Sequence, residues 1–386
     1  MKKIACIAAA VLLTGVFALS ACTGGETLRA KDEYNRFGSQ IRWVYSTAEE
    51  LDADALWAQM TARTAEIEAG ISVSVSGSAA ARFNEAAAGT EIAVDETAYG
   101  ILQTAAAMYT ETGGAYNPAT GLLVDLWGFS PRHRAVDYQP ALPYDRQNFE
   151  ETLPEQKFID AFSAPAMADF SAAALSEADG GYSIAKPAAV ASVDGTDYFM
   201  RISLDGIGKG ASVDAAAEIL CTAGVKYGYY NAGGSSLCVL ENPSRQDGIW
   251  EITVNSPREE LGTSYATLSV KNTTVSTSGD YEQYYEIGGT RYSHIIGRNG
   301  QPVGAGSHIL CATVVGGTAA EGDARATALV TMSAAEAQEY ASAHSDTFRV
   351  IFVWYDAESD EYVLYTNLDQ SQYTVTASFD GVEAFA

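Results

Sequence analysis

The chain has 386 residues and a formal net charge of −26, since 49 aspartate and glutamate residues outnumber 23 lysine and arginine residues. That charge argues against nucleic acid or anionic lipid headgroups as the main partner, because both require a basic face on the protein. Apolar residues make up 47% of the chain and charged residues 19%, the balance of a globular protein with a large buried core.

The N-terminus has the features of a bacterial lipoprotein export signal. Two lysines precede an apolar run over 4–19, and Leu19-Ser20-Ala21-Cys22 has the form of a lipobox, in which the cysteine becomes the lipidated N-terminus. An uncleaved anchor helix is the alternative, but spanning a bilayer usually takes ~20 apolar residues. We therefore expect a signal peptide over 1–21, lipidation at Cys22, a flexible tether over 22–33 and an extracytoplasmic protein anchored by lipid to the bacterial cell membrane.

Three further cysteines lie in the body of the chain, at positions 221, 238 and 311. They are too few and too scattered for a disulfide framework, and no CxxC pair or histidine-rich tract indicates zinc. Each has apolar neighbours, so we expect buried thiols.

Hydrophobic periodicity and turn residues predict the remaining elements. In chain order they are a strand over 36–45, helices over 51–68 and 97–112, a surface loop over 131–154, a helix over 158–173 broken at Pro165, a hairpin or meander over 182–203, a helix over 212–223, several short strands over 228–277, strands at 291–296 and 309–315, a helix over 322–343, and strands at 348–355 and 362–367. Hairpin-like runs of strands with inserted helices indicate an α+β fold with a largely antiparallel sheet. A single domain is expected.

The segment RISLDGIGKGASVDAAAEIL, over 201–220, combines a strand, a glycine turn and the start of a helix. Its glycines allow the backbone to approach a ligand closely, and the helix N-terminus offers unpaired N–H groups to an anion. It matches neither the Walker A pattern nor the spacing of a Rossmann fingerprint. Taken alone, the segment indicates a phosphate site or an ordinary tight turn.

Asp323 and Thr327 lie four residues apart at the start of a predicted helix, so both side chains face the same way. A carboxylate, a hydroxyl and a nearby carbonyl form a hard oxygen set of the kind that suits Mg²⁺, which takes its other ligands from water and phosphate. An aspartate near a helix N-terminus can equally be there for capping alone.

Four stretches of the chain form a set: TGGAYNPATGLLVDLWGF over 112–129, DGIGKGASVD over 205–214, NAGG over 231–234 and DARAT over 323–327. Together, in this order, they resemble the ApbE family of Mg-dependent FAD:protein FMN transferases. The resemblance covers residues 36–345 and implies a single T-fold-like α+β domain over 34–380, with largely antiparallel sheets covered by helices. It also implies that the carbonyl of Gly208, the carboxylate of Asp323 and the hydroxyl of Thr327 bind Mg²⁺. Gly208 stands where the family has alanine.

The same resemblance implies a set of residues around FAD. By their positions in the family's segments these are Phe37, Ser74, Ala115, Tyr116, Asn117, Asp205, Ala211 and Ile295. Asn117 replaces the commoner aspartate, and Phe37-Gly38-Ser39 is similar to the family's M-G-T start. Ser74 stands where the family often has an aromatic residue that would stack on the isoalloxazine. Asn84 occupies a position linked in the family to the choice between FMN transfer and FAD hydrolysis.

The activity that the resemblance implies is transfer of FMN from FAD to a serine or threonine hydroxyl of an acceptor protein, with release of AMP. A base must take the hydroxyl proton, and the candidates are His294, from Ser293-His294-Ile295-Ile296, and Asp280, from a T-S-G-D-Y segment over 277–281. The expected acceptors are electron-transfer complex subunits or exported reductases. Two alternatives stay open: a Mg-dependent FAD pyrophosphatase that releases FMN and AMP, and a lipoprotein that binds FAD without chemistry.

Overall fold

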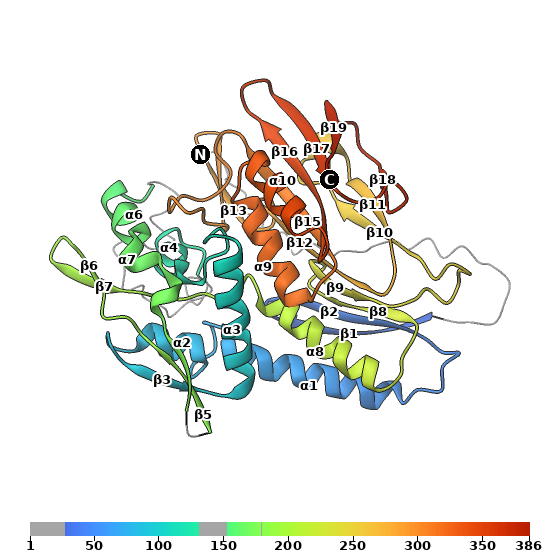
Figure 1. Ribbon diagram of the computed structural model, residues 1–386, viewed down its shortest axis with the longest axis horizontal. Helices are drawn as coiled ribbons and strands as arrows, with labels where there is room; N and C mark the ends of the chain where they lie inside the picture. The colour runs from blue at the N-terminus through green and yellow to red at the C-terminus, as the bar shows by residue number, and fades with distance from the viewer. Residues whose placement is uncertain (1–27, 131–152, 179) are drawn as a thin grey trace, which may run out of the picture.

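The computed structural model describes residues 28–130, 153–178 and 180–386, and a nine-stranded sheet runs through them (Figure 1). The strand order is β1-β2-β8-β9-β12-β15-β16-β17-β19, and every neighbouring pair is antiparallel except β17 and β19. β15 (His308–Val315) lies inside this order and is buried along its whole length. Its sequence, HILCATVV, is the near-continuous apolar run expected of a strand covered on both faces.

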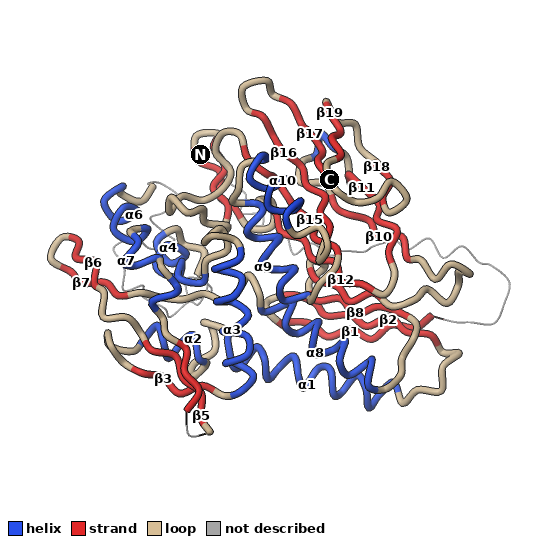
Figure 2. Tube along the Cα trace, viewed as in Figure 1, coloured by secondary structure: helices blue, strands red, loops and turns tan. Residues whose placement is uncertain are grey.

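Within the described residues, the strands form one large sheet and four small ones (Figure 2). The large sheet contains β1 (Leu28–Arg36), β2 (Ser39–Ser46), β8 (Gly228–Ala232), β9 (Ser236–Val239), β12 (Thr273–Gly279), β15, β16 (Arg349–Asp356), β17 (Glu361–Thr366) and β19 (Gly381–Ala384). The small sheets are β10 (Trp250–Asn255), β11 (Ser264–Val270) and β18 (Tyr373–Val375); β3 (Glu91–Val94), β5 (Gly181–Ala185) and β4 (Leu175–Ala178); β6 (Val190–Val193) and β7 (Thr196–Phe199); and β13 (Tyr284–Ile287) and β14 (Thr290–Ser293).

Helices cover one face of the large sheet, where α8 and α9 lie side by side and α1 packs against α8 (Figure 1). The α-helices are α1 (Ala53–Ile71), α2 (Ala79–Glu85), α3 (Glu96–Glu111), α4 (Gly121–Leu126), α6 (Gln156–Ser163), α7 (Pro165–Ala168), α8 (Gly208–Thr222), α9 (Ala319–Val330) and α10 (Ala334–Ala343). Short 3₁₀ turns are η1 (Pro118–Thr120), η3 (Phe170–Ala172) and η4 (Glu259–Leu261).

The core lies on both faces of the large sheet, as the side chains of β15 demonstrate. Ile309, Ala312 and Val314 pack into the cluster on the helix side, whereas Leu310 packs with Leu268 of the β10–β11–β18 sheet on the other side. This two-faced packing of a largely antiparallel sheet, with helices on one side, confirms the predicted α+β class.

Several element boundaries differ from the sequence predictions. The helix predicted over 322–343 is two helices, because Ser333 and Glu336 form a capping box that starts α10 after a break. α8 begins at Gly208 and not at Ser212, so the second half of the glycine segment is already helical. β1 begins at Leu28, so the end of the stretch predicted as a tether over 22–33 is a strand. The predicted break at Pro165 is confirmed, since it separates α6 from α7.

Some predictions fall on residues that the structure does not describe or disagree with those it does. The signal peptide over 1–21, Cys22 and most of the loop over 131–154 lie outside the described residues. Cys238 and Cys311 are buried thiols as expected, but Cys221 is exposed near the end of α8. Within the described ranges, no helix combines the length and apolar character needed to cross a bilayer.

Candidate active site

A cavity of about 470 Å³ lies where the loops after several strands meet the middle of α9 and the start of α8. It brings together segments far apart in the sequence. Its lining contains ten of the residues predicted from sequence: Phe37, Ser74, Ala115, Tyr116, Asn117, Asp205, His294, Ile295, Asp323 and Thr327. Gly208, Ala211 and Asp280 are the predicted residues in the described part of the chain that do not line it.

Asp323 lies in α9, 5% exposed, beside the glycine segment. One carboxylate oxygen accepts a hydrogen bond from the backbone N–H of Gly210 at 2.6 Å, and the other accepts one from the hydroxyl of Ser236. Burial raises the pKa of Asp323 to about 6, although nearby Lys209 and these hydrogen bonds act in the opposite direction. A carboxylate held under this desolvation is a site that gains from a nearby cation.

The oxygen atoms around Asp323 fit a magnesium ion. The hydroxyls of Tyr116 and Ser235 are buried without a hydrogen-bond partner and both residues line the cavity. Thr327 lies one helical turn from Asp323, with its hydroxyl 3.1 Å from that of Ser278. In the described ranges no group of three or more acidic, histidine or cysteine residues could hold a metal, so the ion would rely on hydroxyl, carbonyl, water and phosphate oxygens. Mg²⁺ accepts such a set.

Gly210 makes the close approach of the glycine segment to α9 possible. A Cβ at this position would clash with the carbonyl oxygen of Ala319, the first residue of α9. The second aspartate of the motif, Asp214, instead serves the fold: its carboxylate accepts hydrogen bonds from the N–H groups of Ala319 and Ala320, the first residues of α9. Asp214 thereby fixes α9 against α8, and so the distance of Asp323 from the glycine segment.

Phe37 explains why this chain has glycine at position 208. Phe37 lies in the β1–β2 turn with φ of 47°, and its backbone N–H donates to Glu68 at 2.8 Å. A Cβ on Gly208 would lie 2.8 Å from Cε1 of the Phe37 ring and 3.2 Å from Cδ1 of Ile71. The ring therefore occupies the space that an alanine side chain would need.

Replacement of Gly208 by alanine is expected to displace the Phe37 ring and destabilise the protein by about 1–3 kcal/mol, the usual cost of overpacking a filled site. The double variant Phe37→Met, Gly208→Ala should recover most of that loss, because methionine is flexible enough to yield to the added methyl group. Urea unfolding of the single and double variants measures both effects. Additive losses in the double variant would contradict this steric coupling.

The side chain of Asn117 is used by the backbone. Its Nδ2 donates to the carbonyl of Ala168 at 2.7 Å, and its Oδ1 accepts from the N–H of Ala119 at 2.9 Å, at the start of η1. Asn117 thus shapes the cavity wall while still lining it. Asn84 lies outside this lining and bonds the backbone of Ile202 twice. Its Oδ1 accepts from the N–H of Ile202 at 2.7 Å, and its Nδ2 donates to the carbonyl of Ile202 at 2.9 Å.

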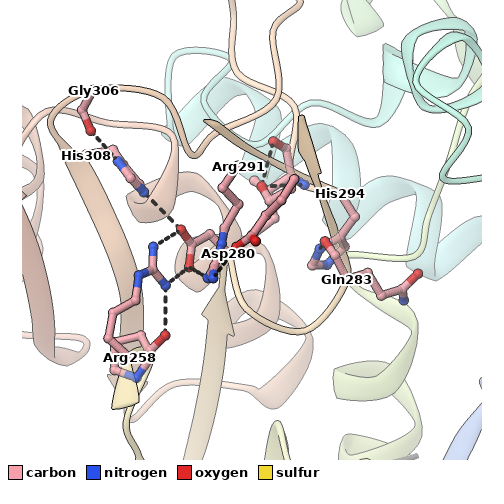
Figure 3. A network of polar contacts seen from close by, with 11 residues as sticks. Arg258, Asp280, Gln283, Arg291, His294, Gly306 and His308 are labelled. Atoms are coloured by element: carbon pink, nitrogen blue, oxygen red, sulfur yellow. Dashed lines mark hydrogen bonds and ion pairs between the residues drawn. The ribbon is translucent and has the colours of Figure 1, made fainter. Parts of the chain in front are cut away.

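His294 directly follows β14, half-buried at the cavity wall (Figure 3). Its Nδ1 lies 3.2 Å from the carbonyl of Gln283, which also accepts the backbone N–H of His294 at 2.9 Å. Because a carbonyl only accepts, Nδ1 carries the proton and Nε2 keeps its lone pair in the neutral ring. The edge of the Phe129 ring packs on the imidazole, with centroids 6.4 Å apart.

Burial lowers the pKa of His294 below its ordinary value of 6.5. The negative charge of Glu282 opposes this effect, the positive charge of Lys209 adds to it, and the hydrogen bond to Gln283 and the charge of Asp205 oppose it less strongly. A neutral imidazole with a free Nε2 lone pair is suited to accept a proton near neutral pH.

Asp280, the other candidate base, is fully buried and points into a cluster of cations (Figure 3). Arg258 donates to both of its carboxylate oxygens, at 2.7 and 2.5 Å. Burial would raise the pKa of Asp280, but the hydrogen bonds from Arg258 and His308 outweigh that cost and lower it. A carboxylate that is stabilised in its ionised form and excluded from the cavity is poorly placed to accept a substrate proton, which favours His294.

Two of the predicted residues lie beside the cavity without lining it. Gly208 is the first residue of α8, so its carbonyl belongs to the first helical turn. Ala211 is buried in the apolar cluster under α8 and α9. Lys209 lines the cavity, but sequence reasoning gave it no role. The sequence does contain a signal for this role, because Lys209 is the one cationic residue of the DGIGKGASVD stretch in a strongly acidic chain.

Comparisons with known proteins identify the family of the chain. A model of the ApbE family matches residues 37–352. The chain is 26% identical over 339 residues to the FAD:protein FMN transferase of Klebsiella pneumoniae, an alignment that covers 87% of this chain and 88% of the relative. It is 28% identical over 263 residues to the FAD:protein FMN transferase of Salmonella typhimurium, covering 68% of this chain and 67% of the relative.

Solved structures share the fold. The ApbE protein of Thermotoga maritima superposes with a TM-score of 0.69 at 21% identity, covering 87% of this chain and 96% of that one. The flavin transferase ApbE of Vibrio cholerae gives 0.65 at 21% identity, covering 92% and 97%. Since the family model spans most of the chain and the same fold recurs in these structures, the chain belongs to the ApbE family.

Proposed function

We propose that this protein transfers the FMN moiety of FAD to a serine or threonine hydroxyl of an acceptor protein and releases AMP. The observation that carries the proposal is the convergence of Asp323 and Thr327 from α9 with His294 from the β14 end on one cavity. An oxygen-ligand site and a neutral base are the two elements that a pyrophosphate displacement by a hydroxyl needs. The names of the matched relatives support the same activity.

The reaction forms one bond and breaks one. The acceptor oxygen bonds to the phosphorus on the FMN side of the pyrophosphate, and the bond from that phosphorus to the bridging oxygen breaks, so that AMP leaves. Nε2 of His294 takes the proton of the attacking hydroxyl, because Nδ1 is already committed to Gln283. General base catalysis of this kind contributes about 10²–10⁴-fold to the rate.

The carboxylate of Asp323 and the hydroxyl of Thr327, which both line the cavity, would hold Mg²⁺. The family resemblance implies the carbonyl of Gly208 as a third ligand, although Gly208 lies beside the cavity in the first turn of α8. When bound, the metal would neutralise negative charge that develops on the pyrophosphate oxygens. Lys209 lines the cavity beside the N-terminal end of α8 and places one positive charge there. Because Glu68, Asp205, Glu282 and Asp323 share the same lining, the metal would have to supply the rest of the positive charge that an anionic substrate needs.

The setting of the reaction follows from the N-terminal sequence. A lipid on Cys22 would tether the domain to the outer face of the cell membrane, where exported reductases and subunits of electron-transfer complexes are accessible as acceptors. The net charge of −26 argues against nucleic acid as a partner.

The proposal is tested with protein that begins at Thr23, incubated with FAD, Mg²⁺ and a threonine-containing acceptor domain. Covalent flavin fluorescence on the acceptor in a denaturing gel, abolished by EDTA, is the expected result. FMN and AMP without a labelled acceptor would instead indicate a pyrophosphatase. Intact bound FAD would indicate a carrier without chemistry.

The transfer rate should depend on pH with an acidic limb that lies below the ordinary histidine pKa of 6.5. The base is active when neutral, and a lowered pKa keeps it neutral to more acidic pH, so activity persists through pH 6.5 and falls only below the lowered value. Initial rates between pH 5 and 8 at saturating Mg²⁺ and FAD measure the limb. A limb centred above 6.5 would contradict the assignment of His294.

A further inference from the structure

Asp280 lies at the centre of a polar network below the β13–β14 hairpin, and the activity proposed above does not use it as a base. The network joins four segments that are separate in the sequence (Figure 3). Arg258 comes from the loop before η4, Asp280 from the loop after β12, Arg291 from β14 and His308 from β15. Nε2 of His308 lies 2.9 Å from a carboxylate oxygen of Asp280, and its Nδ1 lies 2.8 Å from the carbonyl of Gly306.

The β13–β14 hairpin above this network is flanked by His294 and by Gln283, whose carbonyl contacts the His294 ring. Gln283 precedes β13 and His294 follows β14, so the two residues face each other at the base of the hairpin. Backbone hydrogen bonds to Val303 hold the β14 arm. The N–H of Ser293 donates to the carbonyl of Val303 at 3.0 Å, and the N–H of Val303 donates to the carbonyl of Ile295 at 2.8 Å. The β13 arm descends to Asp280, three residues before Gln283.

Asp280 is also the point at which the two arms are joined by charge. Arg291 of β14 lies 3.7 Å from its carboxylate. The other charged and aromatic partners of Arg291, Glu286 and Tyr284, belong to the same hairpin and cannot fix the hairpin to the rest of the fold. Side chains of both arms also contact the body, because Tyr285 of β13 donates to the carbonyl of Gly128 at 3.1 Å and Tyr292 of β14 stacks on Trp127. Asp280, itself held by Arg258 and His308, adds a charged anchor at the base of the hairpin, three residues before Gln283.

We infer that Asp280 is a positioning residue, which sets the Gln283 carbonyl against the His294 ring and so fixes the tautomer and aim of the base. The inference rests on the proposed function for its kinetic consequence but not for its structural one. A buried carboxylate with two arginine partners and a histidine does not line the cavity, so its effect on the reaction passes through its neighbours in the chain, and the hairpin that follows it carries the base. Its charge is required because Arg258 and Arg291 would repel each other without it.

The test compares Asp280→Asn, Arg291→Gln and Leu268→Ala in the protein that begins at Thr23. Asp280→Asn removes the anchoring charge while keeping the shape of the side chain. Arg291→Gln removes the ion pair between Asp280 and the β14 arm and leaves Asp280 paired with Arg258 and His308. This second variant therefore tests the anchoring role if Asp280→Asn folds poorly. Leu268→Ala destabilises the core on the far side of the sheet and serves as the stability-matched control.

Backbone amide exchange over 281–294 should accelerate in both hairpin variants and stay unchanged in the control. The kcat for FMN transfer should fall about tenfold or more in Asp280→Asn, with the KM for FAD changed by less than about threefold, because a misplaced base costs rate and not binding. The acidic limb of the pH profile should move toward the ordinary histidine value as the ring loosens from its packing against Phe129 and its charged neighbours Lys209, Glu282 and Asp205.

Either of two results would overturn the inference: unchanged exchange over 281–294 in both hairpin variants, or a loss of kcat no larger than that of Leu268→Ala at equal thermal stability. If accelerated exchange were found in a protein that labels no acceptor, the anchor would stand and the proposed transferase activity would fail. The two conclusions can therefore be separated.

Discussion

Replacement of Asp323 by asparagine is expected to lower FMN transfer about a thousandfold or more. The variant keeps an oxygen to accept the N–H of Gly210 but loses the one carboxylate among the proposed metal ligands. Metal stabilisation of charge in a displacement is worth several kcal/mol, and each 1.36 kcal/mol corresponds to about a tenfold change in rate. Initial rates of acceptor labelling over a range of Mg²⁺ concentrations measure the loss.

Stability gives the matching control for Asp323→Asn. Burial raises the pKa of Asp323 to about 6, which means that the fold bears the cost of a desolvated charge at neutral pH. The neutral amide avoids that cost, so the melting temperature of the metal-free variant should equal or exceed that of the parent. A parent stabilised by added Mg²⁺ and a variant that is not would locate the metal at Asp323 without any measurement of activity. Equal stabilisation of both proteins would place the metal elsewhere.

Thr327 offers a graded version of the same experiment. Thr327→Ser keeps a hydroxyl within reach of the cavity, whereas Thr327→Val keeps the shape and removes the oxygen. If the hydroxyl is a ligand, only the valine variant should require more Mg²⁺ for half-maximal labelling.

Many residues of the site can be predicted from the sequence, because they lie in short segments in which local spacing alone sets the direction of the side chains. Asp323 and Thr327 face the same way on any helix, so their pairing follows from a spacing of four. The strands and helices with strong apolar periodicity were predicted within a few residues, as for β16 and β17. The two terminal helices were merged into one because Ser333 and Glu336 were not recognised as a capping box.

Other features depend on contacts across the chain that no local pattern encodes. Glycine at position 208 is required by the ring of Phe37, which comes from the first hairpin of the sheet. The role of Asp280 could not be seen, because its partners Arg258 and His308 lie on either side of it in different segments. The T-S-G-D-Y match predicts that the aspartate lies near the site, but it does not predict the direction of the side chain. In the structure this side chain does not line the cavity.

Replacement of His294 by alanine should reduce FMN transfer about 10²–10⁴-fold while leaving FAD binding nearly intact, because the imidazole acts on the acceptor proton and not on the flavin. Asparagine is the more informative companion: its side chain can bond the Gln283 carbonyl but has no lone pair of comparable basicity. Both variants should therefore lose kcat equally.

A nucleophile that needs no general base gives a second test of the role of His294. A serine or threonine hydroxyl needs its proton removed as it attacks, whereas hydroxylamine, a weak base but a strong nucleophile, attacks through a nitrogen lone pair that is free at neutral pH. Added hydroxylamine should therefore restore release of AMP from FAD in His294→Ala and should do nothing for Asp323→Asn, where the electrostatic element is missing. Rescue of both variants, or of neither, would contradict the separation of roles between the hairpin base and the α9 oxygen ligands.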